Sequence, residues 1–570
     1  ESRHATGVAY LLIDRKNDSI TALEQAANGS NDPHTWSDLA AARYAVATQD
    51  ERPSQLQLAL ADADHALRLD PKSPEALFNR ALILEHLGVR DQARKAWEAY
   101  LAVDNGSDWG VEARAHLRAL EKTSRRFDPK LLETEPADRL VREFPEDARR
   151  NGEVTMLAAW ANAEAAGDHV NATAILARVH AIADALAARS QERLLADAVA
   201  AIESSSGDRR AALISGHRIY YDARIDQSNH RFSNAEPQLH RAADLFSRGG
   251  SPMALVSAYY EAQAVSGQNR GELAHQELQS LLSKIDTNRH RALGAEIHWE
   301  LAVCANGAGD WGTGAREAAV ASAIFRNLGE LENSASTDAV AAAALDLMGE
   351  KDAAWNHRIS YVAQAGASGD RQKLGAVLRN AASTLASTGQ TAAASAIINL
   401  AVEEDRSGDA AQLSQAEADA ARFAALNGDL DHARQSLGNA RAASSAVSDA
   451  ALRERVKGRI DLADATALAA AGDTQAAIAS LDRSIDFFTS HQANVEVAQA
   501  YLLRARAERT LGNTALALAG LTSALHEVEK QRATIHDAAS QLSFLDVAGQ
   551  IIEETIDLRL AQGDVRGAFD

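Results

Sequence analysis

The feature that most constrains the fold of this chain is a glycine that returns about every 40 residues, flanked by small residues at fixed distances. In the segment SPEALFNRALILEHLGVRDQARKAWEAY, Ala81 lies seven residues before Gly88 and Ala93 lies five residues after it. A glycine after an apolar-periodic run typically ends a helix, because it adopts the left-handed conformation without strain. The two alanines allow the flanking helices to approach closely, and Trp97 shares the face of Ala93. The segment therefore predicts a tight helical hairpin.

The same spacing recurs along the rest of the chain. It is found at Gly349 (Ala342, Ala354), Gly389 (Ala382, Ala394), Gly428 (Ala421, Ala433), Gly472 (Ala465, Ala477) and Gly512 (Ala505, Ala517), and at Gly309 with Ala302 and Gly314. One helical hairpin cannot bury its own apolar face, so a repeat of this kind predicts stacked hairpins. The period exceeds the roughly 34 residues of a standard tetratricopeptide repeat, which indicates longer helices. We expect an all-α, tetratricopeptide-like α-solenoid of antiparallel helical hairpins, superhelical in its arrangement.

The repeat pattern divides the chain into three parts. Residues 1–122 predict N-terminal tetratricopeptide repeats that end in a capping helix. Residues 123–150 contain three of the nine prolines and predict a linker. Residues 151–570 predict a long-helix tetratricopeptide-like array, although the helical segments between residues 190 and 250 cannot be paired from the sequence.

Charge and cysteine content narrow the classes of function. A net charge of −21 argues against nonspecific nucleic-acid binding. The single Cys304 excludes an internal disulfide framework and fits a reducing compartment, so we expect a cytoplasmic protein. No run approaches the roughly 18 consecutive apolar residues of a membrane span. The chain opens inside a repeat, so we expect its natural N-terminus and any targeting signal to lie upstream.

The sequence lacks the common motifs of catalysis and of metal binding. The sequence contains no GxxxxGK[ST] phosphate loop, no HExxH and no paired-cysteine zinc spacing. His298 precedes Cys304 by six residues, an offset that places the two side chains on different faces of a helix. Histidines in ordinary amphipathic segments predict surface or satisfied side chains: His217, His240, His275 and His432. We therefore expect a core cysteine, no catalytic residue, no metal site and no cofactor.

An ordered series of segments resembles the repeat region of large bacterial TPR–CHAT proteins. The segments are DPKSPEALFNRALILEHLGVRDQARKAWEAYLAVD, EFPEDARRNGEVTMLAAWANAEAAGD, FSRGGSPMALVSAYYEAQA, LMGEKDAAWNHR and LGNTALALAGLTSALHEVEKQRATI. The ending LSFLDVAGQIIEETIDLRLAQGDVRGAFD is similar to the segment that leads into the caspase-like CHAT peptidase of that family. The His/Cys pair of the peptidase has no counterpart here, so the resemblance implies no catalytic residue in this chain.

The resemblance implies a regulatory or sensor module that binds a partner protein or peptide and controls a downstream CHAT peptidase in cis. The alternative is a stand-alone scaffold that assembles other proteins and has no attached enzyme. An enzyme with a site between its helices is a third and weaker interpretation, because no convergent polar constellation is visible in the sequence.

Candidate partner-binding residues come from the first helix of the 74–104 hairpin. In tetratricopeptide arrays this helix lines the concave face, which places Phe78, Leu82 and Glu85 inward. Tetratricopeptide clamps for a terminal carboxylate use Lys and Asn at such places, so Phe and Leu favour an apolar or helical ligand. The alternative is that these side chains pack against the neighbouring repeat.

The C-terminal segment predicts a docking surface for the peptidase. Apolar residues recur there at three- and four-residue steps: Phe544, Val547, Ile551, Ile552, Ile556 and Leu560. A stripe of this width requires a cover, part of which should be the preceding helix over residues 515–530. We assign Phe544, Ile551, Ile552 and Phe569 to docking. The alternative is a frayed terminal helix on which nothing docks.

Overall fold

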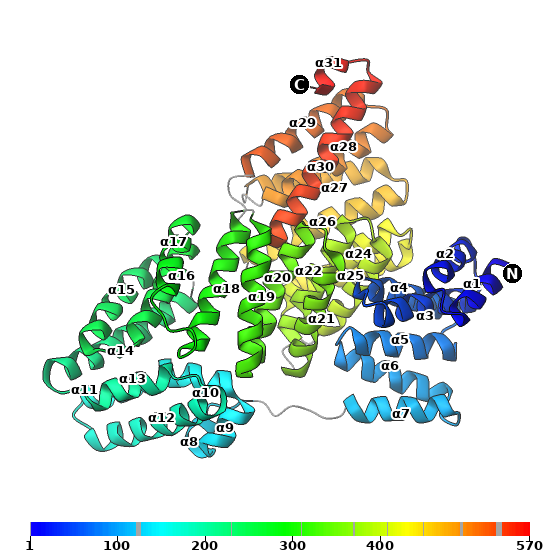
Figure 1. Ribbon diagram of the computed structural model, residues 1–570. Coiled ribbons are helices and arrows are strands. Elements are labelled where there is room, and N and C mark those ends of the chain that lie inside the picture. Colours follow the sequence, from blue (N-terminus) through cyan, green and yellow to red (C-terminus); the bar gives the residue numbers. More distant parts are fainter. Residues whose placement is uncertain are drawn as a thin grey trace. The chain divides into compact units, whose positions relative to one another are not determined.

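The computed structural model describes residues 2–120, 127–229, 231–268, 270–308, 310–368, 371–406, 408–447, 450–490, 494–531 and 538–569 (Figure 1). Some helical side chains also lie outside this description, among them those of residues 538–548 and 569. The described elements are helical throughout, with one short 3-10 turn at Pro53–Gln55 and one π-helical turn at Gly152–Met156. The predicted all-α, tetratricopeptide-like α-solenoid of antiparallel hairpins is confirmed.

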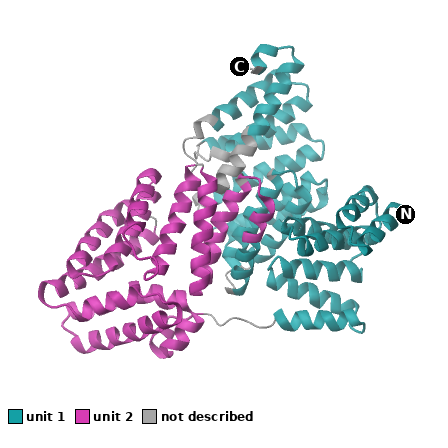
Figure 2. Cartoon of the chain, viewed as in Figure 1, with its two compact units in different colours: residues 1–123, 358–535, 539–570 teal, residues 124–357, 536–538 magenta. Residues whose placement is uncertain are grey.

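The chain forms two compact units (Figure 2). Unit 1 comprises residues 1–123, 358–535 and 539–570. Its helices are α1 (Ser2–Leu12), α2 (Lys16–Ala27), α3 (Pro33–Gln49), α4 (Leu56–Leu69), α5 (Pro74–His86), α6 (Arg90–Val103), α7 (Asp108–Leu120), α22 (Arg371–Ser387), α23 (Thr391–Asp405), α24 (Ala410–Leu426), α25 (Leu430–Ser445), α26 (Ala450–Ala470), α27 (Thr474–Ser490), α28 (Asn494–Thr510), α29 (Thr514–Gln531), α30 (Ala538–Ala561) and α31 (Val565–Phe569).

Unit 2 comprises residues 124–357 and 536–538. Its helices are α8 (Leu131–Thr134), α9 (Ala137–Glu143), α10 (Pro145–Asn151), α11 (Leu157–Ala165), α12 (His169–Ser190), α13 (Leu194–Glu203), α14 (Gly207–Ser228), α15 (Phe232–Gly249), α16 (Met253–Gly267), α17 (Gly271–Leu282), α18 (Arg291–Gly307), α19 (Trp311–Leu328) and α20 (Leu331–Leu347). The division between the units falls inside α21 (Lys351–Ser368).

The small-residue spacing marks the hairpins as predicted. The repeat glycines that the structure describes, from Gly349 to Gly512, all have φ between +77° and +84°, and Gly88 has φ +78°. Every paired alanine is buried to 2% exposure or less, as Ala81 and Ala93 illustrate with 0% each. Gly309 lies outside the described residues. Close approach of the helix backbones therefore explains why only alanine or glycine occupies these positions.

The hairpins between residues 190 and 250, which the sequence left unpaired, are resolved by the structure. Helix α14 pairs with α15, and α16 pairs with α17. Helix α12 contacts α13, while α11 contacts both α12 and α14. The 10-residue α13 contacts the 22-residue α12, and this inequality of helix length explains why the repeat spacing slips in this part of the sequence.

The domain boundaries differ from the prediction in two ways. Most of the expected linker, 123–150, is folded: α8, α9 and α10 contribute Leu132, Leu140 and Ala148 to the core of unit 2. The proline spacing that suggested a linker instead separates three short helices. The expected continuous array 151–570 is also divided, because residues from 358 onward group with the N-terminal repeats. Hydrogen bonding between Gln92 Nε2 and Glu404 Oε1, at 3.3 Å, is one link between the two parts of unit 1.

A buried ionic cluster joins α10, the π-helical turn, α18 and the start of α20 within unit 2. Arg149 is 2% exposed and donates to Glu330 at 2.6 and 2.9 Å, to Glu153 at 3.1 Å and to Glu296 at 3.1 Å. Burial raises the pKa of Glu153 to about 8, although Arg149 opposes this shift. This cluster fixes helices that are far apart in the sequence.

One described helix, α12, has the length and mean hydropathy that a membrane span would need. Its Val179, Ile182 and Leu186 are buried in the core of unit 2. Packing within the unit accounts for part of its apolar character, since 33% of the apolar window is buried.

Candidate functional site

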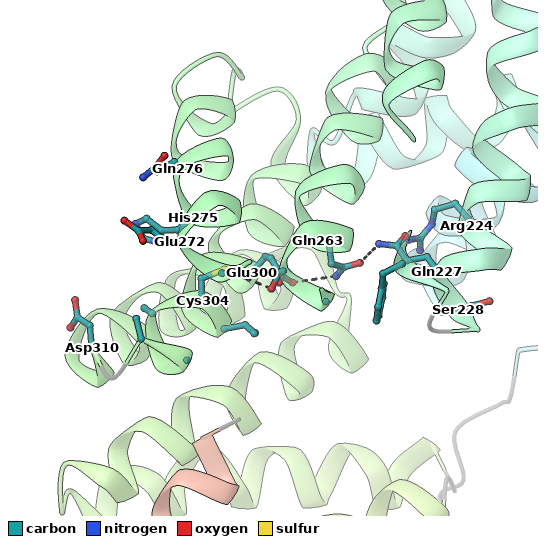
Figure 3. Close-up of a pocket in the computed structure, with 18 of the residues that line it drawn as sticks. Arg224, Gln227, Ser228, Gln263, Glu272, His275, Gln276, Glu300, Cys304 and Asp310 are labelled. Atoms are coloured by element: carbon teal, nitrogen blue, oxygen red, sulfur yellow. Dashed lines mark hydrogen bonds between the residues drawn. The ribbon is translucent and has the colours of Figure 1, made fainter. Parts of the chain in front are cut away.

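The main groove of unit 2 has a volume of about 1180 Å³ and lies among α10, α14, α16, α17 and α18. Figure 3 shows a row of polar side chains across it, from Glu272, His275 and Asp310 on one side to Arg224 and Ser228 on the other. Because successive hairpins each contribute one inner helix, side chains on neighbouring inner helices lie next to each other across the stack.

The floor of the groove is a chain of hydrogen bonds across these inner helices. Gln227 on α14 donates from Nε2 to Gln263 Oε1 on α16 at 2.8 Å. Gln263 donates from Nε2 to Glu300 Oε2 on α18 at 3.3 Å. Gln227 and Glu300 are buried, so these bonds hold both side chains in fixed orientations. The result is a preorganised polar surface at the base of an open groove.

Arg224 stands at one end of this floor. Its guanidinium lies 3.4 Å from the centroid of the Tyr260 ring, and its Nη1 donates to Gln227 Oε1. Its Nε is buried and has no hydrogen-bond partner. No carboxylate of the described residues lies within ion-pair distance of Arg224. Arg150 also lines this end and contacts Glu146 at 3.5 Å, with its own side chain 55% exposed.

Glu300 carries the opposite charge further along the floor. Burial raises the pKa of its carboxyl group, and hydrogen bonds from Ser266 and Gln263 partly offset that effect. Among the residues that the structure describes, no cationic side chain lies within ion-pair distance of Glu300. Glu272 and Asp310, both exposed, add negative charge on the same side of the groove.

Apolar side chains form part of the groove wall. Phe232 packs so closely on α16 that a Cβ on Gly267 would lie 2.8 Å from its ring. Val303 lines the groove and is partly exposed. An apolar wall beside a polar floor suits a ligand that has both a hydrogen-bonding main chain and apolar side chains.

Cys304 also lines the groove, but it is not set up as a nucleophile. Burial raises its pKa to about 11, and its Sγ lies 3.9 Å from Ser266 Oγ. His298 contacts Glu317 Oε2 at 2.6 Å on α19. The predicted separation of His298 from Cys304 is therefore seen in the structure. Within the described ranges, no group of three His, Cys, Asp or Glu side chains is placed to hold a metal ion.

The partner-binding residues proposed in the 74–104 hairpin have intramolecular contacts. Phe78 is 7% exposed and forms edge contacts with Trp97, Tyr100 and Trp109, with ring centroids 5.0 to 5.1 Å apart. Glu85 accepts a hydrogen bond from Trp97 Nε1 at 2.9 Å. Leu82 is half-buried. Phe78 thus occupies the aromatic core of the hairpin, the packing role that was its alternative, while a ligand role for Leu82 and Glu85 stays a prediction.

The residues proposed for peptidase docking divide by burial. Ile551 is fully buried in a cluster with residues of α28 and α29, such as Leu502 and Leu521, so its side chain offers no docking surface. Its burial shows that the preceding helix does provide part of the cover. Ile552 is 46% exposed and remains available for docking. The side chains of Phe544 and Phe569 lie outside the described residues.

Sequence reasoning missed the groove residues Arg224, Gln227, Gln263 and Glu300. Each looks like an ordinary polar residue of an amphipathic helix when taken alone. The available signal was periodic: Gln227 and Gln263 are 36 residues apart, and Gln263 and Glu300 are 37 apart. Polar residues that recur at the repeat length occupy equivalent positions on successive inner helices.

No protein-family profile and no curated protein match the chain. Among solved structures, it is similar to the apo form of the quorum sensor NprR from B. thuringiensis, with 13% identity, 65% of this chain and 97% of that chain covered, and a TM-score of 0.46. It is similar to a Rap protein complexed with competence and sporulation factor (13% identity, 67% and 99% covered, TM-score 0.42). It is also similar to aspartyl phosphate phosphatase F from Bacillus subtilis (12% identity, 82% and 95% covered, TM-score 0.32). All three TM-scores are below 0.5, and the assignment of a tetratricopeptide-like solenoid rests on the hairpins of the chain itself.

Proposed function

We propose that this chain is a protein-interaction module whose unit 2 groove binds an extended segment of a partner protein. The observation that carries the proposal is the hydrogen-bonded floor from Gln227 through Gln263 to Glu300. An extended peptide presents a main-chain donor and acceptor at every residue. The side-chain oxygens of Gln227 and Gln263 each accept one bond and can accept a second from a main-chain N–H, while the unpartnered Nε of Arg224 can donate to a main-chain carbonyl. The volume of about 1180 Å³ also exceeds the range of roughly 300–1,000 Å³ that is typical of small-molecule pockets.

Selection from a random peptide library with the full chain as bait tests this proposal. Gly271 lines the groove at the start of α17, and a Cβ there would have no neighbour within 4 Å. Gly271→Trp should therefore occupy the groove without disturbing the core. We expect this substitution to lower the affinity of the chain for the selected peptides by about tenfold or more, as measured by fluorescence polarisation.

Gly438 on α25 of unit 1 provides a matched control, since a Cβ at this glycine also meets nothing within 4 Å. Gly438→Trp should leave the affinity unchanged. If the library yields no binder, or if Gly271→Trp leaves every selected peptide bound as tightly as before, the groove is not the binding site.

The finer proposal is that the module controls a caspase-like CHAT peptidase in cis, in a bacterial and cytoplasmic protein. Its support is the resemblance of the ordered repeat segments to the TPR–CHAT family. Exposed apolar side chains at Ile552, Leu560 and Val565 provide a surface on which a following domain could pack. The alternative is a stand-alone scaffold, for which the groove would serve equally well.

Hydrogen exchange distinguishes these two functions. A longer natural protein that includes a peptidase should protect amides of α30 relative to this chain. Unchanged exchange throughout α30 would contradict a packed junction. We expect the chain by itself to cleave no peptide, and activity that is abolished by Cys304→Ala would overturn that expectation.

A further inference from the structure

Two charged side chains on the floor of the unit 2 groove make no direct ion pair with a described residue, and they differ in sign. Arg224 has a buried Nε without a partner, and it makes no ion pair with a described carboxylate. Glu300 is 7% exposed and makes no ion pair with a described cation. Most buried charges in proteins are paired, because desolvation of an isolated charge is costly.

These two charges are not paired with each other. Gln227 and Gln263 lie between them and relay hydrogen bonds from one to the other. The side chains around each charge reinforce its sign. Arg150 lines the groove and, together with Arg224, a second hollow beside it, whereas Glu272 and Asp310 line the opposite side of the groove. The groove is therefore polarised along its length.

We propose that the occupant of this groove is a peptide segment with charged side chains of both signs, in which a Lys or Arg is bound by Glu300 and an Asp, Glu or terminal carboxylate is bound by Arg224. This inference rests on the proposed function and specifies its ligand class. A carboxylate at Arg224 would accept from a guanidinium that the Tyr260 ring already holds in place. A cation at Glu300, which is 7% exposed, would supply the direct counter-charge that the described residues do not provide. A segment with charges of one sign would leave one of the two charges unpaired, and a neutral segment would leave both unpaired.

Peptides selected from the random library provide the probe, and they are tested in pairs that differ at one residue. Replacing the selected Lys by norleucine keeps the aliphatic stem and removes the charge. We expect this change to weaken binding to the wild-type chain by about tenfold or more. Glu300→Gln should weaken the Lys peptide to a similar extent and leave the norleucine peptide unaffected, so that the two changes are not additive.

The controls separate recognition from folding. A glutamine at 300 can still accept from Gln263, and circular dichroism should match the wild type. Glu203→Gln removes a half-exposed carboxylate that contacts His180 at 2.9 Å on another surface of unit 2, and it should not alter affinity. The peptide substitutions need no change in the protein, so they decide the question even if Glu300→Gln does not fold. The same cycle with Arg224→Gln and an Asp→Asn peptide tests the other end.

The outcomes distinguish this inference from the proposed function. Peptides that are displaced by Gly271→Trp but change by less than about twofold on loss of their cation or on Glu300→Gln would refute charge recognition and leave the groove as the binding site. Selection of peptides that lack cationic residues would also refute charge recognition and leave the groove as the binding site. Peptides that are insensitive to Gly271→Trp would overturn both.

Discussion

Loss of the Arg149 cation should destabilise unit 2 more than any other single change of a charged residue within its described part. The guanidinium is 2% exposed and contacts Glu153, Glu296 and Glu330, whose side chains are 9% exposed or less. Arg149→Met keeps most of the aliphatic volume but leaves three carboxylates in a site without a counter-charge. Removing one partner of a buried ionic group costs about 3–5 kcal/mol.

The free energy of unfolding lost in Arg149→Met should depend on pH, because the carboxyl groups of the cluster titrate. Burial raises the pKa of Glu153 to about 8 and that of Glu146 to about 7, both above the values of an unfolded chain. The folded state therefore binds more protons than the unfolded state from about pH 4.5, the ordinary carboxyl pKa, up to about pH 7 to 8, and its stability falls as pH rises through that range. Each extra proton contributes at most about 1.4 kcal/mol per pH unit. In Arg149→Met the carboxylates can become neutral by binding protons at low pH. The loss of unfolding free energy should therefore be larger near pH 8 than near pH 5.5.

Hydrogen exchange with mass spectrometry measures the effect within unit 2, where a whole-chain melt would mix the two units. Amides of α18 and α20 should exchange faster in Arg149→Met, most strongly near pH 8. Arg142→Met is the control, because Arg142 is 63% exposed and its contact with Asp138 at 3.5 Å should contribute less than about 1 kcal/mol. If Arg149→Met lowers the unfolding free energy by less than about 1 kcal/mol near pH 8, or by an amount that does not change with pH, the cluster does not stabilise unit 2 through the ion pairs of Arg149.

Three further predictions concern packing and reactivity. Ala477→Phe should cost about 1–3 kcal/mol in thermal unfolding because Ala477 is fully buried, whereas Ala479→Phe on the exposed side of α27 should be nearly neutral. Gly88→Ala should cost more than Gly512→Ala in the same assay: both have positive φ, worth about 1–2 kcal/mol, but only at Gly88 would a Cβ lie 2.8 Å from the backbone of Ala363. Cys304 should react with a thiol reagent near pH 8 far more slowly than glutathione, because burial raises its pKa to about 11; a comparable rate would contradict this environment.

The parts of the fold that the sequence predicted are those that depend on local spacing. Ala81, Gly88 and Ala93 lie within thirteen residues of each other, so a hairpin can be recognised from a short stretch of sequence. The core of unit 2 is different. Arg149 meets Glu296 and Glu330 across separations of 147 and 181 residues, and no local pattern specifies those pairs.

The same reason explains why the sequence could not decide the role of Phe78 and why it missed the groove. An inward-facing aromatic on a first helix could contact a ligand or the aromatic residues of the next helices, and the choice depended on Trp97, Tyr100 and Trp109. Of the three helices that form the groove floor, α14 belongs to the region between residues 190 and 250 where the glycine-centred spacing fails. Periodicity of polar residues at 36 and 37 residues would have been a better guide there than the spacing of small ones.

The two charged clusters of unit 2 show why burial alone does not identify a binding site. Arg149 is more deeply buried than Arg224, yet it already contacts three carboxylates, so a ligand has nothing to add. Arg224 and Glu300 have hydrogen bonds to neutral amides that orient them but do not neutralise them. If these two side chains served only the stability of the fold, we would expect each to have an ion-pair partner within it, because an unpaired buried charge lowers stability. The stability lost through an unpaired charge is explained if a ligand from outside the chain completes the ion pair. We therefore propose binding at α14, α16 and α18 because their charges are unpaired and accessible from the groove.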